Sequence, residues 1–178
     1  MLKSILLVIF AIPAFHEDRG VDGKRAQLEA IARAVAAVSK TADQAAFLLA
    51  WGKAETNFSL RIHRGDCRPW ECDGGKARGP WQLHRVGMPD ELWAKMIGVE
   101  NVQTQAEQAL REVQWAFNIC PRDHVRGAFR VLAGHGCTQP LKDETLRVAE
   151  FKWVRSILLS SPRDDERGRE IAARVSQN

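Results

Sequence analysis

The stretch TADQAAFLLAWGKAETNF, residues 41–58, decides the fold that we expect for this chain. Thr41 followed three residues later by Gln44 is a capping-box pair, which predicts the start of a helix. This helix is apolar on most of its surface, and such helices lie in the centre of a domain. Glu55 interrupts the apolar surface near the end of the helix. We therefore expect a domain built around this segment, with a carboxyl group where the central helix ends.

Helical patterns lie on both sides of the central helix, whereas residues 59–82 break the pattern with glycines and prolines. An irregular stretch of that length inside a domain is usually functional. The sequence therefore predicts a mainly α fold, of the α+β lysozyme-like kind, with one irregular or short-hairpin lobe after the second helix. The expected helices are 25–39, 41–58, 89–98, 101–118, 121–134, 142–160 and a polar last helix over 162–176.

Length and composition are those of one globular domain. The chain has 178 residues, of which 45% are hydrophobic and 27% charged, enough for a substantial core. The formal net charge is +4, and the basic residues are spread along the chain. A nucleic-acid-binding helical protein would need a basic recognition helix. The last helix does not provide one, because its arginines are balanced by acidic residues, so we expect no nucleic-acid partner.

The N-terminus has the pattern of an export signal. Lys3 precedes an apolar stretch from Ile5 to Phe15, which ends sharply at His16. About 20 apolar residues are needed to span a bilayer, so this stretch is too short to cross one, but it fits a secretory signal. We expect residues 1–15 to be a signal peptide or short N-terminal anchor, and residues 24–178 to form the domain. The protein would be exported, periplasmic or extracellular, with membrane contact only through an uncleaved N-terminal segment. A buried N-terminal core segment is the alternative.

Four cysteines in an exported chain indicate disulfides. Three pairings are possible, and we favour Cys67–Cys72 with Cys120–Cys137 because these close the shortest loops. The alternative is a zinc site with nearby histidines, but the chain has no tight C-x-x-C pair. We expect no metal and no cofactor.

Glu55 is the strongest candidate for chemistry. At the helical period it lies on the same side as Trp51 and Phe58. A carboxyl beside aromatic surface is poorly solvated, so it tends to stay protonated, as a general acid must. The alternative is an exposed glutamate at a helix end.

A turn at residues 76–83, KARGPWQL, offers a second set of candidates. Gly79 permits a close approach of backbone or ligand. Trp81 and Gln82 combine a stacking face with an amide, and sugars are bound through apolar ring faces and hydroxyl hydrogen bonds. The alternative is an ordinary turn with a core tryptophan.

These two segments together resemble a known family. Glu55-Thr56-Asn57-Phe58 resembles the Glu-Ser-x-Phe motif of the soluble lytic transglycosylase and goose-type lysozyme superfamily, with Thr56 in place of serine. The segment 77–83 resembles its Gly-Ala-x-Gly-x-x-Gln-hydrophobic motif. The resemblance covers residues 45–83 and extends more weakly to 148–159. It implies a peptidoglycan-cleaving enzyme that acts on glycan strands, with Glu55 as general acid/base and Gln82 in the cleft. Thr56, Gly79 and Trp81 are the accompanying substrate-binding candidates.

The family's third motif, Ala-Tyr-Asn-x-Gly, falls near residues 132–136, where this chain has LAGHG. His135 is therefore the polar candidate at that position, with a surface turn as the alternative. A hydrolase also needs a second carboxylate. Asp73 ranks before Asp66 and Glu71, because the two following glycines could let its loop approach the cleft; loop solvation is the alternative.

The expected reaction is cleavage of the β-1,4 bond between N-acetylmuramic acid and N-acetylglucosamine, giving 1,6-anhydro products. A hydrolytic lysozyme and a non-catalytic wall-binding module of the same fold remain alternatives.

Overall fold

The computed structural model describes residues 1–12, 18, 21–68 and 70–160. It is mainly helical, as the sequence predicts, and these residues contain a single two-stranded sheet. The helix expected over 162–176 lies outside the described residues. The elements in chain order are α1 (Leu2–Ala11), α2 (Lys24–Val38), α3 (Ala42–Thr56), α4 (Leu60–His63), α5 (Cys72–Gly75), β1 (Ala77–Arg78), β2 (Leu83–His84), α6 (Asp90–Ala94), η2 (Val99–Asn101), α7 (Val102–Ile119), α8 (His124–Leu132) and α9 (Glu144–Ser160).

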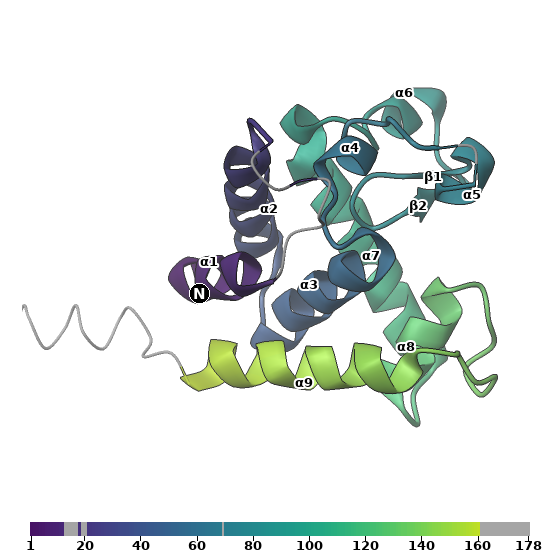
Figure 1. The fold of residues 1–178 in the computed structure, drawn as a ribbon. Coiled ribbons are helices and arrows are strands. Elements are labelled where there is room, and N and C mark those ends of the chain that lie inside the picture. Colours follow the sequence, from purple (N-terminus) through teal and green to yellow (C-terminus); the bar gives the residue numbers. More distant parts are fainter. Residues whose placement is uncertain (13–17, 19–20, 69, 161–178) are drawn as a thin grey trace, which may run out of the picture.

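Helix α3 is the centre of the domain. Residues 45–51 are all buried, and the helix packs against α9, α7 and α2 (Figure 1). It begins as the capping box predicts: the Gln44 backbone N–H donates to Thr41 Oγ1 at 3.2 Å. The Gln44 side chain accepts from the Lys40 backbone N–H at 2.7 Å. The helix ends at Asn57, whose left-handed backbone turns the chain toward the lobe. Glu55 is thereby fixed on the last turn of the most buried helix.

The expected helices differ from the observed ones mainly in length. The pattern over residues 89–98 forms only the short helix α6, because the chain turns after Ala94 and enters η2 through Gly98, which has a positive φ. The pattern over 121–134 begins later, at α8, where the Asp123 side chain accepts from the Arg126 backbone N–H.

The N-terminal segment forms α1, which packs against α2 and α9. Its residues Ile5, Val8 and Ile9 are completely buried in the core. This is the packing that the sequence analysis held as its alternative, a buried N-terminal segment, although residues 13–15 lie outside the described residues. Removal of the segment as a signal stays a prediction. Among the described helices, none is long and apolar enough to cross a membrane.

The irregular lobe between α3 and α7 contains α4, α5, α6 and the hairpin, which confirms the expected short hairpin (Figure 1). In the antiparallel pair, Ala77 faces His84 and Arg78 faces Leu83. Two disulfides are present, Cys67–Cys72 in the lobe and Cys120–Cys137 between the end of α7 and the loop after α8. They are the shortest-loop pairs favoured from the sequence, and they are compatible with an exported protein.

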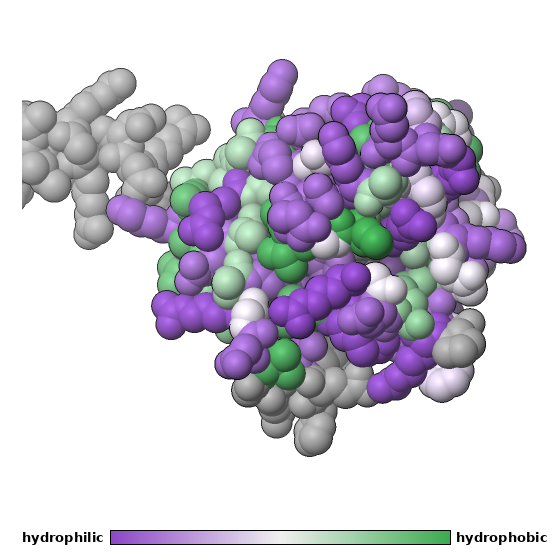
Figure 2. Space-filling model, turned by 90° about the horizontal axis from the view of Figure 1, so that it is seen from above, coloured by the Kyte–Doolittle hydropathy of each residue, from purple (hydrophilic) through white to green (hydrophobic). Residues whose placement is uncertain are grey.

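The face seen from above, on the side of the lobe, is largely hydrophilic (Figure 2). Hydrophobic residues appear in several groups among the hydrophilic ones on this face.

Candidate functional site

Glu55 lines a cavity of about 720 Å³ between the lobe and the helices α7, α8 and α9. The site residues predicted from the sequence that line this cavity are Glu55, Asp73, Trp81 and Gln82. Thr56, Gly79 and His135 are not among its lining residues. The remaining lining residues are His84 and Val86 from the lobe, Gln108, Glu112 and Trp115 from α7, Val131, Leu132, Ala133 and Gly134 from α8 and its end, and Arg147 from α9.

The Glu55 carboxylate is paired with a cation. Arg147 Nη1 donates to Glu55 Oε1 at 2.5 Å, and Arg147 Nε donates to Asp143 Oδ2 at 3.1 Å. Burial lowers the pKa of the Arg147 guanidinium, but the attraction of Glu55 and Asp143 outweighs it and raises that pKa overall. The aromatic neighbours expected for Glu55, Trp51 and Phe58, are both buried in the core. Glu55 itself remains 22% exposed, enough to meet a ligand in the cavity.

Thr56 holds the end of α3 against the lobe. Its hydroxyl lies 2.9 Å from the Pro80 carbonyl oxygen and 3.2 Å from that of Gly52, and it accepts a hydrogen bond from the Phe58 backbone N–H. The side chain is buried. Thr56 therefore positions Glu55 relative to the turn at residues 79–82.

Gly79 allows that turn to pack tightly. Its φ is +70°, and a Cβ added there would lie 2.7 Å from the Met96 carbonyl oxygen. A side chain at this position would therefore displace backbone, which makes the glycine a packing requirement of the lobe.

Trp81 is a wall of the cavity and also part of the core. It is completely buried, and its Nε1–H donates to the Leu48 carbonyl oxygen at 2.8 Å. This is the core tryptophan that the sequence analysis held as an alternative. Gln82 is more accessible, and its amide donates to the Gly79 carbonyl oxygen at 3.1 Å and lies 3.6 Å from Cys72 Sγ. Its φ of +49° is uncommon for a residue with a side chain, and such conformations concentrate at functional sites.

Asp73 lies at the rim of the cavity, 69% exposed, with its carboxylate 3.2 Å from His84 Nε2. The two following glycines have positive φ and place this loop beside the hairpin. His84 was not predicted as a site residue. His135 instead forms a turn after α8, where its backbone N–H donates to the Arg130 carbonyl oxygen.

Helix α7 supplies a row of site residues that the sequence analysis missed. Gln108, Glu112 and Trp115 follow the helical spacing i, i+4, i+7, which puts them on one side of the helix. Trp115 is 54% exposed, an unusual state for a large aromatic side chain. Burial raises the pKa of the Glu112 carboxyl, opposed by a hydrogen bond from Gln108 and by the charge of Arg111. The 3.6-residue period of the helix is the sequence signal that places these three residues on one side of α7.

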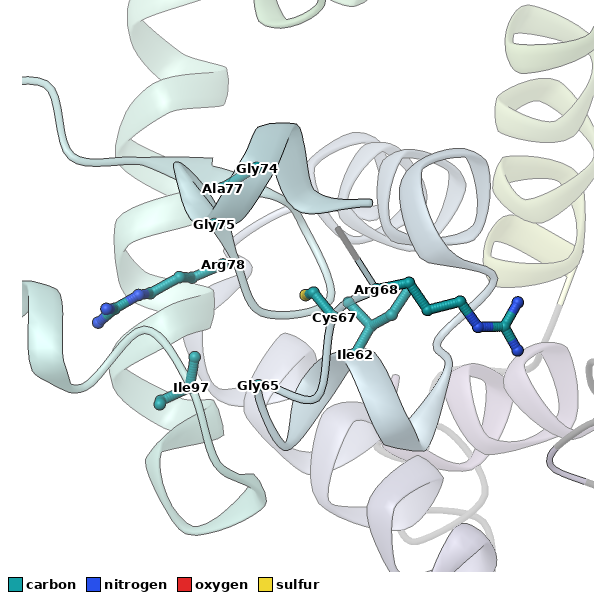
Figure 3. A pocket seen from close by; sticks show the side chains of 9 residues that line it. All are labelled: Ile62, Gly65, Cys67, Arg68, Gly74, Gly75, Ala77, Arg78 and Ile97. Carbon is teal, nitrogen blue, oxygen red and sulfur yellow. The ribbon is translucent and has the colours of Figure 1, made fainter. Parts of the chain in front are cut away.

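A smaller cavity of about 480 Å³ lies within the lobe (Figure 3). Its charged lining side chains are Arg68 and Arg78, which point away from each other. Arg78 donates to the Trp93 carbonyl oxygen at 2.9 Å and stacks 4.2 Å above the Trp93 ring. Among the described residues that line this cavity, none has a carboxyl, amide or hydroxyl side chain.

The cysteines considered as zinc ligands are both joined in the lobe disulfide. Within the described residues, no group of three or more His, Cys, Asp and Glu side chains is placed to hold a metal ion. Comparisons with protein-family models, curated proteins and solved structures found no match to this chain.

Proposed function

We propose that this protein cleaves the β-1,4 glycosidic bond between N-acetylmuramic acid and N-acetylglucosamine in peptidoglycan, with Glu55 as a catalytic carboxyl. The observation that carries the proposal is the shared cavity of Glu55 and Gln82. They come from the two segments that resemble the lytic transglycosylase and goose-type lysozyme motifs. Their separation of 27 positions makes this meeting a property of the fold rather than of local sequence.

The lining of the cavity suits a sugar chain. An exposed aromatic face at Trp115 can stack on a pyranose ring, and the amides of Gln82 and Gln108 can bind hydroxyl and acetamido groups. Apolar residues around Leu132 complete the opposite side. Polar groups of fixed position among apolar walls are the usual composition of a small-molecule site.

Within this site Glu55 has a role in proton transfer. When the glycosidic bond breaks, the 4-oxygen of N-acetylglucosamine takes up a proton and leaves the anomeric carbon of muramic acid. The muramic acid 6-hydroxyl adds to that carbon and gives its proton to a base, and a carboxylate can accept it. The product then ends in a 1,6-anhydro ring. Arg147 holds the Glu55 side chain in one orientation before substrate binds, which reduces the ordering cost of the reaction.

Hydrolysis is the second candidate, because Asp73 lines the same cavity and could act as the second carboxylate. The two reactions differ in product mass, since an anhydro end is lighter than a reducing end by one water molecule. Asp73→Asn should leave anhydro-product formation nearly unchanged, whereas it should abolish hydrolysis that depends on Asp73.

The decisive experiment digests purified peptidoglycan with wild type and Glu55→Gln and analyses the released muropeptides by mass spectrometry. We expect Glu55→Gln to fold normally and to lose lysis, because glutamine keeps the shape of the side chain but cannot transfer the proton. Glu91→Gln, on the exposed surface of α6, is the matched control. Lysis by Glu55→Gln within about tenfold of wild type would refute the role of Glu55. Binding to walls without any cleavage by wild type would instead indicate the wall-binding module.

A further inference from the structure

Glu112 enters the cavity from the side of α7, whereas Glu55 enters it from α3. Its helix is anchored behind it, because Ala109, Val113 and Ala116 are completely buried in the core. Neighbouring turns of the same helix place Gln108 and Trp115 in the same cavity. Glu112 is therefore carried by an anchored helix, beside the groups that suit a sugar.

The two glutamates have opposite surroundings. Glu55 is paired with the guanidinium of Arg147. Glu112 instead receives a hydrogen bond at 3.3 Å from a neutral amide, Gln108 Nε2. The burial of Glu112 disfavours its charged form, and its pKa is raised accordingly. Two carboxyl groups that line one cavity, one paired with a cation and one beside a neutral amide, suit the different roles of base and acid.

We propose that Glu112 is a second catalytic carboxyl, which protonates the leaving glycosidic oxygen while the Glu55 carboxylate accepts the proton of the attacking hydroxyl. This assignment rests on the proposed function. The proton of Glu112 goes to the 4-oxygen of the departing N-acetylglucosamine as the bond from that oxygen to the anomeric carbon breaks. After this departure the anomeric carbon carries positive charge. The 6-oxygen of muramic acid then adds to that carbon from the face that the 4-oxygen has left, and its proton goes to Glu55. Exchange with solvent returns both carboxyls to their starting states.

Other charged groups lie near Glu112 or line its cavity. Arg111 is its neighbour on α7 and favours the ionised form, and Arg147 from α9 lines the same cavity. From the lobe, Asp73 and His84 line the same cavity. The part of the wall formed by α8, residues 131–134, carries no titratable side chain.

The test compares wild type, Glu112→Gln, Glu55→Gln and the control Glu107→Gln on soluble peptidoglycan fragments across a range of pH. Glu107 is exposed on the same helix and lies outside the cavity. An acid must be protonated and a base deprotonated, so wild-type activity should fall at both ends of the pH range. We expect Glu112→Gln to lower kcat by about 10²–10⁴-fold and to lose the alkaline limb of the profile, with KM little changed. Glu107→Gln should behave as wild type.

The result distinguishes this inference from the proposed function. If Glu55→Gln is inactive while Glu112→Gln keeps both limbs and a kcat within about threefold of wild type, the role of Glu112 is refuted and the function stands. A wild-type profile without an alkaline limb refutes it even if Glu112→Gln does not fold. An inactive wild type refutes both.

Discussion

Stability should fall in mild acid because of one buried histidine. His63 is completely buried at the end of α4, with its Nδ1 3.1 Å from Gln27 Nε2. Burial lowers the pKa of His63 from 6.5 to about 4. As the pH falls below 6.5, the unfolded chain binds a proton at this position, whereas the folded chain does not until about pH 4. The stability contribution of neutral His63 is therefore complete above pH 6.5 and is lost as the pH falls toward about 4.

The size of the effect follows from that difference in pKa. One pKa unit corresponds to about 1.4 kcal/mol, so the complete loss is about 3 kcal/mol, of which about 2 kcal/mol is gone by about pH 5. This is a large part of the 5–15 kcal/mol stability that is usual for a domain.

Urea unfolding at about pH 7 and about pH 5 measures this loss of stability. The proteins compared are wild type, His63→Gln and the control His84→Gln, which alters an exposed histidine. The free energy of unfolding of wild type and His84→Gln should drop by about 2 kcal/mol more than that of His63→Gln between the two pH values. Using the difference between two pH values cancels whatever His63→Gln does to stability at neutral pH. Equal drops in all three proteins would show that His63 does not control acid stability.

Two further substitutions probe the support of the site. Gly52→Ala should destabilise the protein by about 1–3 kcal/mol in denaturant unfolding and reduce lysis, because its Cβ would lie 2.4 Å from the buried Phe58 ring. Gly136→Ala is the control: it has open space around it and should change neither stability nor lysis. Equal stability of the two variants would contradict the packing argument. Replacing Cys120 and Cys137 together by serine should lower the free energy of unfolding by about 3 kcal/mol, as expected for a disulfide that closes a loop of this length. Thermal unfolding measures the effect, and an unchanged Tm would show that this disulfide does not stabilise the fold.

Most of the fold could be predicted from the sequence, because long helices leave a periodic pattern and α3 is marked by its cap and its apolar surface. The hairpin and the two disulfides followed from local turn residues and from loop length. The short elements were harder to predict. The ends of α6 and α8 are determined by where the chain must turn to meet its neighbours, not by periodicity.

The candidate site was predicted only where local sequence carries the signal. Glu55 and Gln82 follow motifs, and both line the cavity. Arg147 lies 92 positions from Glu55, and only the packing of α9 on α3 brings them together. Thr56 and Gly79 are predicted to bind substrate, and this stays a prediction. In the structure Thr56 holds the lobe to α3, whereas Gly79 allows tight packing against Met96. A motif residue can be required because it positions its neighbours, and sequence alone does not separate the two roles.

The Cys67–Cys72 disulfide makes the shape of the cavity depend on whether the surroundings are oxidising or reducing. It closes the short loop that leads directly into Asp73, and Gln82 lies against its sulfur. In a reducing cytosol this loop would lose its covalent tie, and one wall of the cavity would lose its fixed shape. A protein made in that compartment would gain this covalent tie only in oxidising surroundings.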